Sequence, residues 1–150
     1  MVRNALLVGK NQWNEVADVE TVLELDLPTI ECLPVEISQA VFQLVANASQ
    51  AIAASNPEGR GSIRVTTRRA GDSAEIEVRD TGTGIPEDIR TRVFDPFFST
   101  KDVGRGTGLG LAIVYDTVVN KHGGEVSCES ELGVGSVFCI RLPVLVTHSV

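Results

Sequence analysis

The pattern of hydrophobic and polar positions predicts a long helix over residues 35–55. Its apolar residues recur every three or four positions and form one stripe: Ile37, Val41, Leu44, Ala48 and Ile52. This spacing is typical of an amphipathic α-helix that packs one side against a core. Gln43, Asn47 and Gln50 follow one another by four and three positions, so we expect a polar row beside the stripe.

Shorter segments, in which β-branched or apolar residues alternate with polar ones, predict five strands. They lie at residues 21–25, 62–68, 74–79, 125–129 and 136–142. Residues 69–73 predict a hairpin between the second and third strands. Pro86 suits the start of a short helix that runs to about Arg90. Pro143 ends the last strand.

A glycine-rich stretch, Gly104-Arg-Gly-Thr-Gly-Leu-Gly110, precedes a second helix, predicted from about residue 109 to a glycine C-cap at Gly123-Gly124. Glycines at alternate positions leave backbone N–H groups uncovered, and a helix N-terminus attracts anions, so phosphate binding is one interpretation. A flexible surface loop is the other. The stretch fits neither the dinucleotide fingerprint nor the protein-kinase glycine loop, because a leucine stands at the required sixth glycine. The P-loop pattern does not occur either.

This order of elements predicts an α+β domain with helices on one face of a mixed, mostly antiparallel sheet. We expect residues 1–20 to be a linker, residues 21–143 to form one domain and residues 144–150 to be a tail.

Composition narrows the possible functions. The 150 residues carry a net charge of −7 without a long basic block, which argues against nucleic-acid binding and against contact with an anionic membrane. Cys32, Cys128 and Cys139 form neither a disulfide framework nor a zinc motif. No apolar run reaches membrane-spanning length. We expect a cytoplasmic domain, although its parent protein could be membrane-anchored.

Two polar residues stand where they could bind a nucleotide. Asp80 follows a predicted strand and precedes Gly82 and Gly84, so its carboxylate could accept a hydrogen bond from an amino group such as adenine N6. An ordinary Asp-Gly turn explains the same residues. Asn47 could supply an oxygen ligand to Mg²⁺, or it could be a solvent-facing amide.

Four further polar residues indicate a function less clearly. Lys101 and Arg105 could neutralise phosphate charge or could be solvated loop residues. His122 suits a helix end, where positive charge is favourable. Neither His122 nor His148 has a base or nucleophile placed beside it by the sequence.

Taken together, the segments resemble the catalytic and ATP-binding domain of bacterial sensor histidine kinases. These kinases belong to the ATPase superfamily shared with DNA gyrase, heat-shock chaperone ATPases and the mismatch-repair ATPase. The resemblance covers roughly residues 22–143. It rests on the N box at 43–48, the G1 box at 80–84, the F box at 94–101 and the G2 box at 106–111. The family's ending is matched by residues 122–124 followed by residues 133–143.

The resemblance implies a two-layer α/β sandwich of Bergerat type, with ATP between helices and sheet under a lid that joins the F and G2 boxes. Asp80 would hold the adenine amino group, and Asn47 would bind Mg²⁺, with Gln43 as a further candidate ligand. The G2 box would cradle the phosphates through Gly106, Thr107, Gly108, Leu109 and Gly110. The other implied ATP-binding residues are Gly82, Gly84, Ile85, Lys101, Arg105 and Ser136. We expect the lid to be ordered with nucleotide and loose without it.

Two departures from the family pattern refine the expected function. The first N-box position, commonly Asn, is Gln43; an amide cannot act as a general base, which favours phosphoryl transfer over self-contained ATP hydrolysis. No histidine is followed by the acidic residue and proline of a phosphoacceptor box. We therefore expect a monomeric fragment whose partners are the parent's dimerisation and phosphoacceptor domain and a downstream response regulator. An anti-sigma-type serine kinase and a non-catalytic ATP-sensing module remain alternatives.

Overall fold

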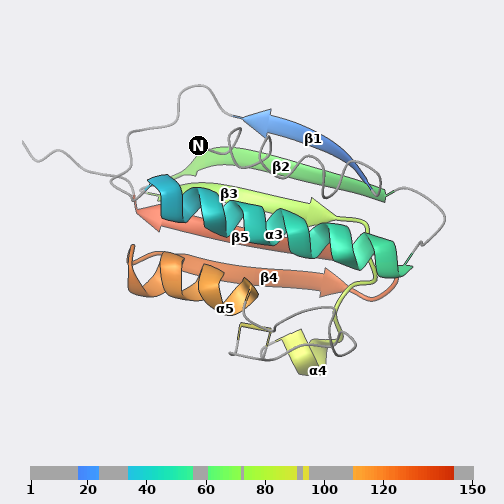
Figure 1. The fold of residues 1–150 in the computed structure, drawn as a ribbon. Helices are drawn as coiled ribbons and strands as arrows, with labels where there is room; N and C mark the ends of the chain where they lie inside the picture. Colours follow the sequence, from blue (N-terminus) through green and yellow to red (C-terminus); the bar gives the residue numbers. More distant parts are fainter. Residues whose placement is uncertain are drawn as a thin grey trace, which may run out of the picture.

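One mixed sheet of five strands organises the domain. The computed structural model describes residues 17–23, 34–55, 61–71, 73–90, 93–94 and 110–143. The strand order is β1-β2-β3-β5-β4 (Figure 1). The strands are β1 (Ala17–Leu23), β2 (Gly61–Ala70), β3 (Ser73–Asp80), β4 (Glu125–Glu131) and β5 (Gly135–Pro143). Only β1 and β2 are parallel, and every other neighbouring pair is antiparallel, as predicted.

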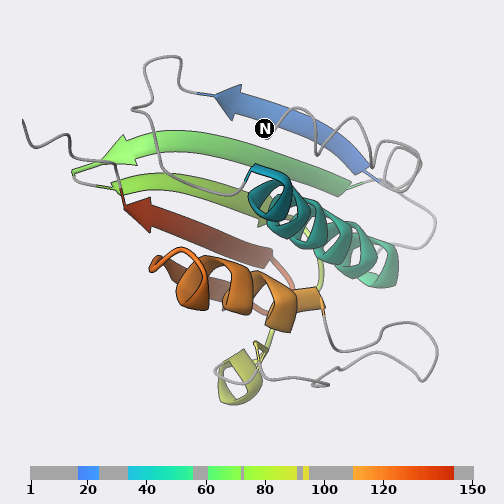
Figure 2. The ribbon, with the colours of Figure 1, turned by 60° about the vertical axis from the view of Figure 1, so that its left-hand side comes forward.

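Helices lie on one face of this sheet (Figure 2). The long helix α3 (Pro34–Ser55) crosses it beside α5 (Gly110–Tyr115), which continues as the π-helical stretch η1 (Asp116–Asn120). The short helix α4 (Glu87–Arg90) lies apart, below β4 in Figure 1. The predicted two-layer arrangement is confirmed. Among the described residues, no helix is long and apolar enough to cross a membrane.

The core lies between the helices and the inner face of the sheet. The predicted stripe of α3 is almost completely buried, from Ile37 to Ile52. It meets the inward positions of the central strands: Ile63, Val65, Ile76, Val78, Phe138, Ile140 and Leu142. Phe94, in the predicted F box, packs its ring edge-on to Phe138 at 6.1 Å between centroids and lies 6.0 Å from Tyr115. Burial of this apolar surface is the main favourable term in folding.

The outer face of the sheet is charged. Arg64 pairs with Glu20, Arg68 pairs with both Glu75 and Glu77, and Arg141 pairs with Glu75. These pairs join neighbouring strands, where facing side chains lie close enough to interact. The inner face of the sheet is therefore apolar and covered by helices, whereas the outer face carries charged side chains.

Two local features differ from the sequence-based predictions. The first strand begins at Ala17 rather than at residue 21, because Ala17 and Val19 face the core while Asp18 and Glu20 face outward. The second long helix changes from α to π geometry at Asp116, where the Lys121 N–H donates to the Asp116 carbonyl five residues back. Its predicted glycine C-cap is confirmed, because Gly123 has a φ of 65° and the Gly124 N–H donates to the Val118 carbonyl.

Candidate functional site

The site is centred on Asp80, the last residue of β3. Its side chain is buried, with the residue only 4% exposed. The carboxylate oxygen Oδ1 accepts a 2.8 Å hydrogen bond from the Gly82 N–H. Burial raises the pKa of Asp80, while hydrogen bonds from the backbone N–H groups of Gly82 and Ser136 act in the opposite direction. No lysine or arginine of the described chain forms an ion pair with it, so its remaining lone pairs suit a neutral hydrogen-bond donor.

The loop after Asp80 lies against the turn between β4 and β5. Gly84 has a φ of 76°, and a Cβ there would collide with the Glu131 carbonyl oxygen. Gly135 has a φ of 147°, and a Cβ there would collide with the Asp80 carbonyl oxygen. Both positions therefore require glycine. The Gly133 N–H also donates to the Thr83 carbonyl at 2.9 Å, which fastens the turn to the loop.

Helix α3 forms a wall along the site and contacts it at two points. A Cβ at Gly82 would lie 2.7 Å from the Ala51 Cβ, and a Cβ at Gly110 would lie 2.8 Å from the Gln43 amide oxygen. Gln43, Asn47 and Ala51 stand four residues apart on one side of α3. At a rise of 1.5 Å per residue, the two contact points are about 12 Å apart along the axis. Along α3, Asn47 lies midway between the residues that contact Gly82 and Gly110.

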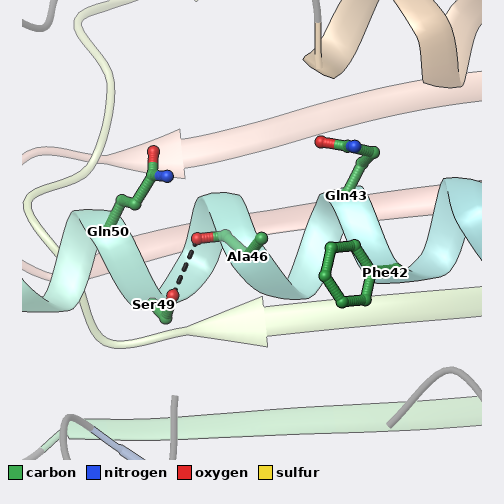
Figure 3. Close-up of a pocket in the computed structure, with 5 residues that line it drawn as sticks. All are labelled: Phe42, Gln43, Ala46, Ser49 and Gln50. Atoms are coloured by element: carbon green, nitrogen blue, oxygen red, sulfur yellow. Dashed lines mark hydrogen bonds between the residues drawn. The ribbon is translucent and has the colours of Figure 1, made fainter. Parts of the chain in front are cut away.

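A cavity of about 330 Å³ lies along the same helix, lined by Phe42, Gln43, Ala46, Ser49 and Gln50. Figure 3 shows Gln43 and Gln50 extending to one side of α3, away from Phe42. Ser49 is held by a 2.8 Å hydrogen bond from its hydroxyl to the Ala46 carbonyl. Gln43 and Gln50, two members of the polar row predicted from the sequence, therefore line this cavity.

The structure brings the described site residues into two groups. Asp80, Gly82, Gly84, Ile85 and Ser136 gather where β3 and β5 meet the following loop. Gln43 and Gly110 lie together at the α3–α5 contact, with the Gln43 oxygen against Gly110, and Asn47 lies one turn further along α3. The predictions for Lys101, Arg105, Gly106, Thr107, Gly108 and Leu109 lie outside the described residues.

One residue of this site was not predicted from the sequence. The Ser130 hydroxyl accepts a 2.6 Å hydrogen bond from the Ile85 N–H and lies 2.9 Å from the Ser136 hydroxyl. A signal for it does exist, because Ser130 follows Val126 and Cys128 on the inward positions of β4. A polar residue at an inward position needs a hydrogen-bonding partner, which makes it a candidate site residue.

The ionisable side chains around the site limit its chemistry. No group of three or more His, Cys, Asp or Glu residues capable of holding a metal occurs within the described ranges. The Cys128 thiol is free, and burial raises its pKa to about 12, so it is not a nucleophile at neutral pH. His122 lies at the end of η1, where its Nδ1 is 2.7 Å from the Thr117 carbonyl oxygen.

Comparison with known proteins agrees with this geometry. Residues 32–146 match the family described as "Histidine kinase-, DNA gyrase B-, and HSP90-like ATPase". Sensor kinase CckA of Brucella abortus (strain 2308) is 39% identical over 159 residues, which cover 95% of this chain. The chain spans only 15% of the length of that relative.

Solved structures show the same fold. The catalytic domain of histidine kinase ThkA superimposes with a TM-score of 0.80 at 27% identity, covering 95% of this chain and 89% of that one. Full-length ShkA in complex with AMPPNP also gives a TM-score of 0.80 at 27% identity, covering 95% of this chain and 29% of that one.

Proposed function

This chain belongs to the family of histidine kinase-, DNA gyrase B- and HSP90-like ATPases, and we propose that it is the ATP-binding catalytic domain of a two-component sensor histidine kinase. It would transfer the ATP γ-phosphoryl group to a histidine on the dimerisation domain of the parent kinase. Asp80 carries this proposal, because a buried carboxylate beside close-packed glycines is suited to an adenine amino group. The resemblance to ShkA, which was solved with AMPPNP, supports the choice of nucleotide.

The nucleotide would lie along α3 from the Gly82 contact to the Gly110 contact. The adenine amino group would donate to Asp80, and the purine would rest on the backbone of Gly82 and Gly84. The phosphates would reach the N-terminus of α5 at Gly110, where N–H groups and the helix dipole favour anions. The remaining G2 residues, with Lys101 and Arg105, would complete the phosphate contacts.

Mg²⁺ fits the donor chemistry of this arrangement. It commonly takes one or two protein oxygens together with phosphate oxygens and waters, so a cluster of carboxylates is not required. Asn47 would supply the protein ligand because it lies between the two ends of the site. When bound, the ion would neutralise charge on the β- and γ-phosphates. Gln43 would be a second contact only after turning from Gly110.

The transfer would be an in-line displacement at the γ-phosphorus. A nitrogen of the acceptor imidazole forms the new P–N bond, and the bond to the β–γ bridging oxygen breaks and releases ADP. The imidazole proton passes to a base on the dimerisation domain. This chain would contribute positioning and charge stabilisation, which are most of what phosphoryl transfer requires. A response regulator would take the phosphoryl group in turn; the domain would act in the cytoplasm and would be monomeric alone.

A mixing experiment tests this function. The chain is incubated with γ-labelled ATP and the separately produced dimerisation domain of its parent kinase. We expect acid-labile label on that domain, as phosphohistidine would give, and no label when the acceptor histidine is replaced. Acid-stable label on a serine would instead support a serine kinase. Bound ATP without any transfer would support an ATP-sensing module.

The metal assignment predicts a separate effect of Asn47→Ala. The variant should lose at least about tenfold in ATP affinity with Mg²⁺ present, because one inner-sphere oxygen is removed. Affinity in EDTA should be nearly unchanged. Titration calorimetry in both conditions measures the difference, with Gln50→Ala, in the same polar row, as the comparison variant. An unchanged dependence on Mg²⁺ in the Asn47 variant would remove this residue from the metal site.

A further inference from the structure

We propose that Ser130 is a positioning residue that sets the preference of this site for adenine over other purines. It lies on β4, outside the four sequence boxes, and would not touch the nucleotide itself. Its hydroxyl joins three segments that surround Asp80: the loop at Ile85, the turn at Gly135 and the start of β5 at Ser136. The inference rests on the proposed adenine contact of Asp80.

The hydrogen bonds of Ser130 have one assignment that satisfies every group. The Ile85 N–H donates to the Ser130 oxygen at 2.6 Å. The Ser130 hydroxyl donates to the Gly135 carbonyl at 3.1 Å. The Ser136 hydroxyl then donates to the Ser130 oxygen at 2.9 Å. Ser130 thus uses its proton and both lone pairs, which is the full capacity of a hydroxyl group.

These bonds hold both sides of the Asp80 carboxylate. On one side, Ile85 ends the loop that begins with Gly82, whose N–H donates to Asp80. On the other side, the Ser136 N–H donates to Asp80 and opposes the effect of burial on its ionisation. Like the Asp80 carboxylate itself, the Ser130 hydroxyl bonds to both flanking segments. Its removal would free the carboxylate to shift relative to the purine surface.

Base selection depends on that position. The amino group of adenine donates to a carboxylate, whereas hypoxanthine presents an oxo oxygen that the carboxylate repels. A shift of the Asp80 carboxylate would weaken the attraction and the repulsion together. The ratio of ADP affinity to IDP affinity would therefore fall. A loss of general stability would lower both affinities and leave the ratio unchanged.

The experiment measures ADP and IDP affinities by calorimetry for the 150-residue chain and four variants. Ser130→Ala removes the hydroxyl. Ser130→Cys keeps the volume but is a poor acceptor, so it serves if the alanine variant does not fold. Ser130→Thr keeps the hydroxyl. Ser127→Ala makes the same change at an exposed position on the other face of β4.

We expect Ser130→Ala and Ser130→Cys to lower the ADP-to-IDP affinity ratio at least fivefold. Ser130→Thr and Ser127→Ala should keep the wild-type ratio. A fall in melting temperature with an unchanged ratio in both the alanine and the cysteine variants would overturn the inference and leave the proposed function intact. A wild-type chain that binds ADP and IDP equally would instead overturn the Asp80 assignment and, with it, this role of Ser130.

Discussion

Asp80 and Glu75 are two buried carboxylates on the same strand, and their pKa values are shifted in opposite directions. Both residues are almost covered from solvent, at 4% and 5% exposed, but Asp80 lies on the inner face of the sheet and is surrounded by many more protein atoms than Glu75, which lies on the outer face. Asp80 faces the helix layer, and burial raises its pKa. Glu75 faces outward, where burial alone would raise its pKa, but the charge of Arg68, a hydrogen bond from the Cys139 thiol and the charge of Arg141 together lower it.

A second difference lies in the partners of each carboxylate. Glu75 contacts Arg68 at 3.3 Å and Arg141 at 3.4 Å, so its charge is matched within the protein. Asp80 has only backbone N–H donors among the groups described. An ionised acid kept in a buried place without a cation costs stability, and such groups are enriched at functional sites. Glu75 thus lies nearer the surface with its charge matched, whereas Asp80 lies deeper without a cation, which is the environment expected of the proposed binding residue.

Asp80→Asn should produce the largest effect, and it should separate nucleotide affinity most clearly from stability. Nucleotide affinity should fall at least about 100-fold, because the amide would present its own N–H groups to the adenine amino group. The melting temperature should stay the same or rise, because the variant no longer holds a buried charge. Calorimetry with ADP and a thermal melt without nucleotide measure the two effects. Retained ADP affinity would show that Asp80 does not bind the base.

Glu75→Gln should lower stability and leave nucleotide affinity almost unchanged, and its effect should be smaller than that of Asp80→Asn. The free energy of unfolding should fall by about 0.5–1 kcal/mol, because two partly exposed arginines lose their charged partner. ADP affinity should change less than twofold, since the side chain lies on the outer face of the sheet. Urea unfolding and calorimetry provide the measurements, with Glu129→Gln, an exposed position on β4, as control. A large loss of ADP affinity would mean that the two carboxylates are coupled through β3.

The smallest effects should appear in the dependence of stability on pH. A lowered pKa in the fold adds stability above the ordinary carboxyl range, and this gain is lost on acidification. The deficit of Glu75→Gln relative to wild type should therefore shrink as the pH falls from 6 to about 3. A raised pKa has the opposite sign, so any advantage of Asp80→Asn should shrink over the acidic range. Differences that stay constant with pH would contradict both assignments.

The sequence predicted the elements whose pattern is strong. The α3 stripe from Ile37 to Ile52 marked a helix because each apolar residue has a neighbour three or four positions away. The hairpin of β2 and β3 followed from simple alternation. The start of β1 was missed because small Ala17 and a single Val19 give little alternation against Asp18 and Glu20. The π geometry of η1 has no residue pattern that announces it.

The candidate site was predictable only where a single segment determines it. Asp80 and Gly82 are neighbours in sequence, so a strand end followed by glycine was enough to mark them. Ser130 and Ile85 are 45 positions apart, and their contact depends on how β4 pairs with β5 and how the loop returns. The contact of Gln43 with Gly110 likewise arises only when α3 and α5 pack together. The alternation along β4 can mark Ser130 as an inward polar residue, but it does not say which segments that residue contacts.

The two contacts of α3 would set the length of the ligand that the proposed site accepts. A rigid helix holds the two points that contact Gly82 and Gly110 about 12 Å apart along its axis, whatever lies between them. A compound that fills only the Asp80 end would gain the base contacts but none from the N-terminus of α5. An inhibitor built to span both ends would therefore be selected by its length as well as by its base. Inserting or removing one residue between Gln43 and Ala51 would rotate the two contact points apart by about 100°.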